Sequence, residues 1–257
     1  MRRNRPPLLD AHAHLDQYDD AHLPAVLAAL AAQRIFTIAV SMDAASYART
    51  CAIAARSPWV MPAFGVHPWH AATAWQTRHT WLHHLAEAPL FGEIGLDTVW
   101  APPNTLDVQR RIFHLFLEAA AARHLLINLH TKGAEAEIRD NLRAFGITPA
   151  IIHWYSGPLD VLDDLIADGH VFTIGVELPY TPHIQAIARR IPLGQLLTET
   201  DNSGGLPWLT GETGMPHHLH GVLTHLAALR GLSVDEVRAH VWHNWRHLCA
   251  TYRLEVR

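Results

Sequence analysis

Short apolar runs rich in β-forming residues recur eight times along the chain, and a segment long enough for a helix separates each from the next. The runs span residues 8–12, 35–40, 60–66, 90–94, 125–130, 150–153, 171–176 and 196–201. Strands that alternate with helices are typical of βαβ units, which build parallel sheets. Eight units predict a (β/α)8 TIM barrel of the α/β class, a fold that about 250 residues build as one domain. We therefore expect residues 1–257 to form a single barrel domain.

Helical periodicity supports this prediction in the segment after the fourth run. One apolar stripe at helical spacing comprises Val108, Ile112, Leu115, Phe116 and Ala119, and Arg110, Arg111 and Glu118 fall outside it. Asn104 or Thr105 is expected to cap this helix. Further helices are predicted at 22–33, 44–56, 75–87, 134–144, 158–168 and 182–190.

The chain after the eighth run departs from this rhythm. Residues 202–216, NSGGLPWLTGETGMP, are rich in Gly and Pro and predict a loop. A loop of this length inside a compact domain usually serves a binding site or is disordered. Two additional C-terminal helices are predicted at about 217–230 and 233–252.

The composition narrows the class of protein. With 49% hydrophobic and 17% charged residues, the chain has enough apolar surface for a large core and does not resemble a disordered protein. The net charge of -4 provides no global attraction to nucleic acid, so contact with a polyanion must be local or carried by bound cations. Two cysteines make no disulfide framework, and no signal peptide or membrane span is evident, so we expect a cytoplasmic protein. The oligomeric state stays open, and a monomer is compatible with the sequence.

The first candidate chemistry is the pair His12 and His14 in DAHAHLD, at the end of the first predicted strand. Side chains two residues apart on a strand share a face, so both imidazoles can reach one divalent ion. A lone H-x-H is a weak signal taken by itself. The prediction of a metal site becomes stronger if other candidate ligands lie at the ends of strands on the same rim of the barrel.

Glu93 in LFGEIGLD is a carboxylate inside an otherwise apolar run, where an unpaired charge costs several kcal/mol. A core ion pair would satisfy it. The alternative is a carboxylate whose two oxygens bridge two metal ions.

Three further candidates end apolar runs: His130 in LLINLHTKG, His153 in AIIHWYSG and Asp201 in LLTETDN. Each of the histidines taken alone is more often a hydrogen-bonded core residue, and Asp201 alone is more often a cap. Together on the strands of one barrel they predict metal ligands, because the carboxyl ends of the strands share one rim. In a metal centre that activates a water molecule for attack on a substrate, Asp201 is also the expected acceptor of that water's proton. Glu199, two residues earlier on the same face, is expected to orient a ligand or the water.

His67 in FGVHPWH ends the third run and is expected either to contact a substrate phosphate or to pack in its loop.

Aromatic residues also fall in the predicted rim loops: Trp69, Trp100, Trp154, Tyr155 and Trp208. They are interpreted either as buried loop anchors or as faces on which nucleobases stack.

With these motifs in hand, the chain resembles the TatD family of metal-dependent hydrolases, a branch of the amidohydrolase-like barrels. The resemblance rests on seven signatures in order: DAHAHLD, GVHP, GEIGLD, LHT, IHWYSG, ETD and NWRHL. It implies a dinuclear centre with two divalent ions, Mg²⁺, Mn²⁺ or Zn²⁺. In that centre His12, His14 and Asp201 hold one ion, His130 and His153 hold the other, and Glu93 bridges.

The resemblance also implies a deoxyribonuclease that cleaves DNA phosphodiesters, often from 3′ to 5′. The chain departs from many members at Lys132 and Gly133 after the fifth-strand histidine, and at residues 202–204 after ETD. Both departures fall in loops that meet substrate rather than metal. Lys132 is therefore a predicted substrate contact that acts as a point charge for phosphate. Trp154 and Tyr155 are also predicted substrate contacts, as aromatic residues beside the metal site on which nucleobases can stack.

Two rival hypotheses stay open. The same centre would activate water against a small ester, lactone, amide or phosphate, because the fold hosts many chemistries. A catalytically silent metal-binding subunit is the alternative from another class, although the ligand set is complete.

Overall fold

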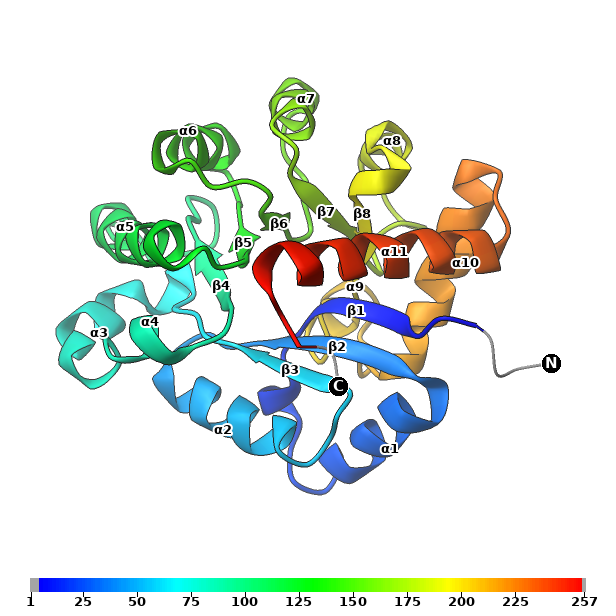
Figure 1. The fold of residues 1–257 in the computed structure, drawn as a ribbon, viewed down its shortest axis with the longest axis horizontal. Coiled ribbons are helices and arrows are strands. Elements are labelled where there is room, and N and C mark those ends of the chain that lie inside the picture. The colour runs from blue at the N-terminus through cyan, green and yellow to red at the C-terminus, as the bar shows by residue number, and fades with distance from the viewer. Residues whose placement is uncertain (1–4, 256–257) are drawn as a thin grey trace.

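The computed structural model describes residues 5–255 and contains eight short strands in the predicted places (Figure 1). The strands are β1 (Leu8–Ala13), β2 (Ile35–Val40), β3 (Val60–Ala63), β4 (Phe91–Gly95), β5 (Ile127–His130), β6 (Ile151–Ile152), β7 (Val171–Ile174) and β8 (Leu196–Thr198). Neighbours pair in chain order and in parallel, in one sheet of β1–β3 and another of β4–β8. The predicted TIM barrel is thus confirmed, although β3 and β5–β8 are shorter than the apolar runs that predicted them.

Two seams close these sheets into a barrel. At the first, a parallel bridge joins Phe64 to Phe91. At the second, the Asp201 amide donates to the His12 carbonyl at 3.0 Å, and the Thr198 hydroxyl donates to the Leu9 carbonyl at 2.6 Å. Regular strand pairing is therefore replaced by specific hydrogen bonds where the last strand meets the first.

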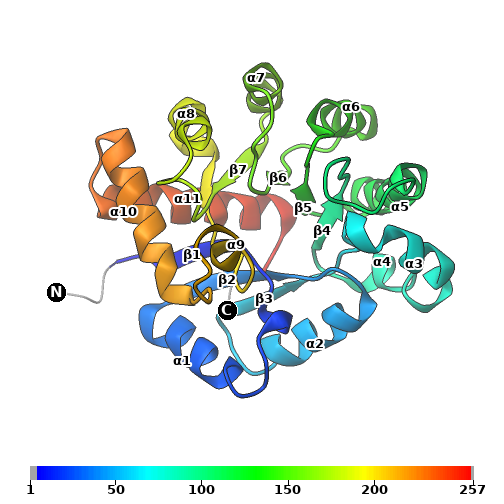
Figure 2. The same cartoon turned by 180° about the vertical axis from the view of Figure 1, so that it is seen from behind.

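The helices within the described residues are α1 (Leu23–Gln33), α2 (Ala44–Ala54), α3 (Ala71–Gln76), α4 (His84–Glu87), α5 (Leu106–Arg123), α6 (Glu135–Phe145), α7 (Leu159–Ala167), α8 (Pro182–Arg190), α9 (Gly205–Thr210), α10 (Leu219–Arg230) and α11 (Val234–Tyr252). Most of the helices surround the barrel on the outside, whereas α11 crosses one end of it and α9 lies at the other end (Figures 1 and 2). Short 3-10 turns lie at η1 (Leu15–Gln17), η2 (Pro68–His70), η3 (Arg78–Thr80), η4 (Leu193–Gln195) and η5 (Pro216–His218). No helix within residues 5–255 combines the length and the apolar character needed to cross a bilayer.

Three local predictions differ in part from the structure. The helix expected at 75–87 is broken into the end of α3, then η3 and α4, because the side chains of Thr77 and Thr80 hydrogen-bond to nearby carbonyls and compete with helical pairing. Thr105 occupies the N-cap position of α5, as predicted, but its side chain makes no capping hydrogen bond, because its hydroxyl donates to the Pro102 carbonyl instead. Finally, the predicted loop 202–216 contains a short helix, α9.

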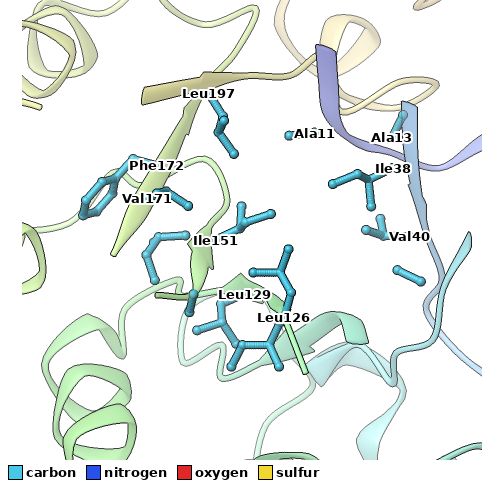
Figure 3. Packing of buried hydrophobic residues seen from close by; sticks show 14 of the residues in the cluster. Ala11, Ala13, Ile38, Val40, Leu126, Leu129, Ile151, Val171, Phe172 and Leu197 are labelled. Carbon is cyan, nitrogen blue, oxygen red and sulfur yellow. The ribbon is translucent and has the colours of Figure 1, made fainter. Parts of the chain in front are cut away.

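The barrel has a closed end and an open end. Helix α11 crosses the amino ends of the strands (Figure 1), where the Asn244 amide donates to the carbonyls of Leu193 and Leu196 and Trp245 packs beside Phe36. Inside, aliphatic side chains such as Ile38 and Ile151 point toward a common centre from opposite sides (Figure 3). This apolar filling leaves the polar strand ends at the other rim.

Candidate metal centre

The polar residues that end the strands converge on Glu93, which is almost completely buried in β4. Its Oε2 lies 3.4 Å from His12 Nε2 and 3.2 Å from His14 Nε2. Its Oε1 lies 2.9 Å from His130 Nδ1 and 3.8 Å from His153 Nε2. The two carboxylate oxygens thus face two separate imidazole groups.

Asp201 completes the first group. Its Oδ1 lies 3.7 Å from His12 Nε2 and 3.4 Å from His14 Nε2. Asp201 lies three residues after the end of β8, and its backbone has a positive φ of 51°. Burial raises the pKa of the Asp201 carboxyl, against the opposing pull of the nearby histidines.

The charges in this cluster are strongly coupled. Burial opposes ionisation of Glu93, yet His67 and His12 beside it hold the pKa of its carboxyl well below the usual range. Burial likewise disfavours a charged His12, but Glu93 and Asp201 outweigh this and raise its pKa to about 10. A bound cation would replace the imidazolium proton as the partner of these carboxylates, because metal-ligating histidines are neutral.

Polar residues that hydrogen-bond to the buried histidines determine which ring nitrogen faces Glu93. Asn128 Oδ1 accepts from His12 Nδ1 at 2.9 Å, and Glu199 Oε2 accepts from His153 Nδ1 at 2.7 Å. Burial of Glu199 raises its pKa to about 7. In both pairs Nε2 is directed at Glu93, so each ring is held in one orientation.

His130 is oriented the other way round. Its Nε2 donates to Asp97 Oδ2 at 2.9 Å, which leaves Nδ1 toward Glu93. The roles of Asp97 and Asn128 were not predicted from the sequence. Asn128 had a usable signal, since it is a polar residue in an apolar strand two positions before His130 and therefore shares its face.

The residues present fit a divalent metal. His12 Nε2 is buried and has no hydrogen-bond partner among the described residues, as expected of an atom whose lone pair serves a metal. Ligand atoms lie within 4.8 Å of one another in three buried groups: His12, His14 and Glu93; His67, Glu93 and His130; and His12, His153 and Glu199. Imidazole and carboxylate together suit zinc, manganese and iron.

His67 lies in this cluster rather than only in its loop. Its Nδ1 accepts from the Trp69 amide at 3.1 Å, which leaves the proton on Nε2, 3.3 Å from Glu93 Oε1. Burial lowers the pKa of His67 to about 4, so the ring is neutral near pH 7. Its expected contact with a substrate phosphate stays a prediction.

A pocket of about 460 Å³ opens above the cluster. Lys132 and Trp154 line it, as do Trp100 and Trp208. Tyr155 does not line the pocket: it is buried, and its hydroxyl donates to the Pro158 carbonyl at 2.7 Å. This placement supports the loop-anchor interpretation of Tyr155 and argues against a substrate contact, because the side chain points into the packing around β7.

Comparison with known proteins agrees with this geometry. The chain is 25% identical over 257 residues to human deoxyribonuclease TATDN3, covering 92% of each chain. It is 32% identical over 156 residues to the 3′-5′ ssDNA/RNA exonuclease TatD of Yersinia pseudotuberculosis, covering 56% of this chain and 58% of that one. The crystal structure of the TatD homolog YJJV from Escherichia coli has the same fold, with a TM-score of 0.85 at 22% identity over 94% of this chain and 97% of that one.

A family model extends this similarity along nearly the whole chain. The TatD related DNase model matches residues 9–250, a span that contains every residue of the Glu93 cluster. The chain therefore belongs to the TatD related DNase family of metal-dependent hydrolases.

Proposed function

We propose that this protein is a two-metal deoxyribonuclease that removes nucleotides from DNA ends in the 3′ to 5′ direction. The observation that carries the proposal is Glu93, whose two oxygens face two different groups of imidazole nitrogens. A carboxylate in this position fits a bridge between two ions. Deoxyribonuclease relatives among the similar proteins support DNA as the substrate.

The residues of the Glu93 cluster would hold the two ions in separate groups. His12, His14 and Asp201 would hold one ion, His130 and His153 the second, and Glu93 would join the two sites. When bound, such ions withdraw charge from a phosphoryl oxygen and lower the pKa of a water molecule.

Asp201 is the proposed acceptor of the water's proton, because its carboxylate lies at the pocket and burial makes it more basic. Glu199 holds His153 in place from behind. His67 lines the pocket with its protonated Nε2 3.3 Å from Glu93 Oε1 and is proposed to contact a substrate phosphate. Lys132 also lines the pocket and is the positive charge proposed to meet a phosphate. Free Cys51 and Cys249 fit a reducing compartment such as the cytoplasm, which we propose as the site of action.

A substrate panel tests the proposal. The metal-loaded protein is incubated with 5′-labelled single-stranded DNA, RNA, a lactone and small esters, and a shortening ladder on DNA is expected. Asp201→Asn should lower kcat by about 10²–10⁴-fold, the usual contribution of a general base. Asp107→Asn is the matched control, because Asp107 is exposed on α5 and outside the pocket.

Faster turnover of small esters or lactones than of DNA would overturn the nuclease proposal in favour of a small-molecule hydrolase. Metal-loaded protein that hydrolyses nothing in the panel would instead identify a binding subunit. An Asp201→Asn variant with near-normal kcat would remove Asp201 as the base.

A further inference from the structure

Three tryptophans form a cluster on the wall of the same pocket: Trp100 from the loop after β4, Trp154 from the loop after β6, and Trp208 on α9. The ring centroids of Trp154 and Trp208 are 6.1 Å apart, and those of Trp100 and Trp208 are 5.8 Å apart. Both pairs meet edge to face. Segments far apart in the sequence thus build one continuous aromatic surface.

This tryptophan cluster is exposed to a degree that packing alone does not explain. Trp208 is 63% exposed and Trp100 is 48% exposed. A core anchor would be buried, as Trp81 and Trp245 are at 1% or less. Contiguous exposed aromatic surface beside a pocket marks a binding site.

The cluster is directly continuous with the metal centre. Trp154 follows His153 in the chain, and their rings lie 6.0 Å apart. Gly205 at the start of α9 approaches so closely that an added Cβ would lie 2.7 Å from the Thr200 carbonyl and 3.0 Å from Trp154. The absence of a side chain at Gly205 therefore lets α9, which carries Trp208, lie at the open end of the barrel (Figure 2).

The charged residues beside the tryptophan cluster differ in sign, so one part of the cluster suits a phosphate and another part suits an uncharged base. Lys132 Nζ lies 4.5 Å from the Trp100 ring centroid and donates to Ser156 Oγ at 2.9 Å, which leaves two of its three donors for an anion. On the other side, Glu177 accepts hydrogen bonds from the Trp154 indole and from Thr181. A carboxylate there repels phosphate, so this side favours an uncharged ring.

From this arrangement we infer that Trp100, Trp154 and Trp208 are a stacking platform for one unpaired nucleobase next to the scissile phosphate, with Lys132 on that nucleotide's backbone. This inference rests on the proposed nuclease function and names the substrate class within it. A paired base inside a duplex already has both faces stacked and cannot reach the platform. The enzyme therefore prefers single-stranded or frayed ends to blunt duplex ends.

The test compares variants on substrates that differ only in the base. Trp208→Ala should raise the KM for single-stranded DNA by roughly 5- to 150-fold, the usual loss for one stacked base. It should leave kcat/KM unchanged on an oligonucleotide whose 3′-terminal nucleotide is abasic, and on methyl p-nitrophenyl phosphate. Trp208→Phe, which keeps an aromatic face, should recover most of the lost affinity.

Tyr180→Ala is the matched control, because Tyr180 is an aromatic residue with 57% exposure that does not line the pocket. Its KM for single-stranded DNA should stay at the wild-type value. Equal KM for normal and abasic ends in the wild type would overturn the platform, as would cleavage of blunt duplex at the single-strand rate.

A binding measurement separates this inference from the nuclease proposal. Fluorescence anisotropy of a labelled single-stranded oligonucleotide is recorded with the metal-loaded Asp201→Asn variant, with and without Trp208→Ala. A 5-fold or larger loss of affinity on adding Trp208→Ala supports the platform, even if the wild type cleaves no DNA. Unchanged affinity overturns the platform, even if the wild type proves to be a nuclease.

Discussion

Asn128 offers a sharp test of how the metal centre is built. It is fully buried in β5, where its Oδ1 accepts from His12 Nδ1 at 2.9 Å and its Nδ2 donates to the Ala11 carbonyl at 2.8 Å. Asn128→Leu keeps the shape of the side chain and removes both hydrogen bonds. His12 is then free to rotate or to place its proton on Nε2, the nitrogen that faces Glu93.

Two magnitudes follow from this contact. Loss of a partner that orients a ligand typically lowers metal affinity by about 10- to 100-fold, which is about 1.4–2.7 kcal/mol. The same change leaves two buried polar groups unpaired at about 1–3 kcal/mol each, so the free energy of unfolding of the metal-free protein should fall by about 2–6 kcal/mol. The dissociation constant is measured by competition with a chelating dye, and unfolding by urea titration with a chelator present.

The chain contains a matched control on its surface. Asn141 makes the same pair of bonds, with Oδ1 accepting from His114 Nε2 at 2.7 Å and Nδ2 donating to the Glu137 carbonyl at 2.8 Å, but water replaces both easily. Asn141→Leu should leave the metal affinity unchanged and cost less than about 1 kcal/mol. If Asn128→Leu binds metal within twofold of the wild type, the orienting role of Asn128 is refuted.

Three further outcomes are expected. Burial lowers the pKa of His170 to about 4 in the folded protein, below its unfolded value of 6.5, so its contribution to stability is present above pH 6.5 and is lost as the pH falls toward 4. Between pH 7.5 and 5, the free energy of unfolding in urea should fall by about 2 kcal/mol more for the wild type than for His170→Gln. Equal decreases for the two proteins would contradict this prediction. Gly95 has a φ of +147°, and an added Cβ would lie 1.9 Å from the His130 carbonyl, so Gly95→Ala should destabilise by more than about 2 kcal/mol in thermal unfolding, whereas Gly221→Ala, which meets nothing within 4 Å in α10, should be neutral or stabilising. Metal at 100 times its dissociation constant should stabilise the folded protein by about 2.7 kcal/mol relative to the protein in excess chelator. A melting temperature that is the same with and without chelator would argue against a metal bound by the folded state.

Much of the fold was predictable because it depends on local pattern. Apolar runs of strand length, spaced by helical segments, encode a parallel barrel whatever the details of packing. The residues that end those runs, such as His12, Glu93 and His153, follow from the same pattern, since all carboxyl ends of the strands meet at one rim. The break in segment 75–87 was not predictable in this way, because it depends on hydrogen bonds of individual side chains. Thr77 and Thr80 donate to nearby carbonyls, and the buried indole of Trp81 donates to the Ala74 carbonyl.

By itself, the sequence determined the order of strands, the identity of the polar residues at their ends and the resemblance to a family. Only the tertiary structure decided which nitrogen of each imidazole faces Glu93, that Tyr155 is buried away from the pocket, and that Trp208 stands beside Trp154. These outcomes depend on contacts between distant segments, such as His12 with Asn128, which are 116 residues apart. Hydrophobic periodicity reports which face of one segment is buried. The orientation of a side chain in the site depends instead on hydrogen-bonding and packing partners from other segments.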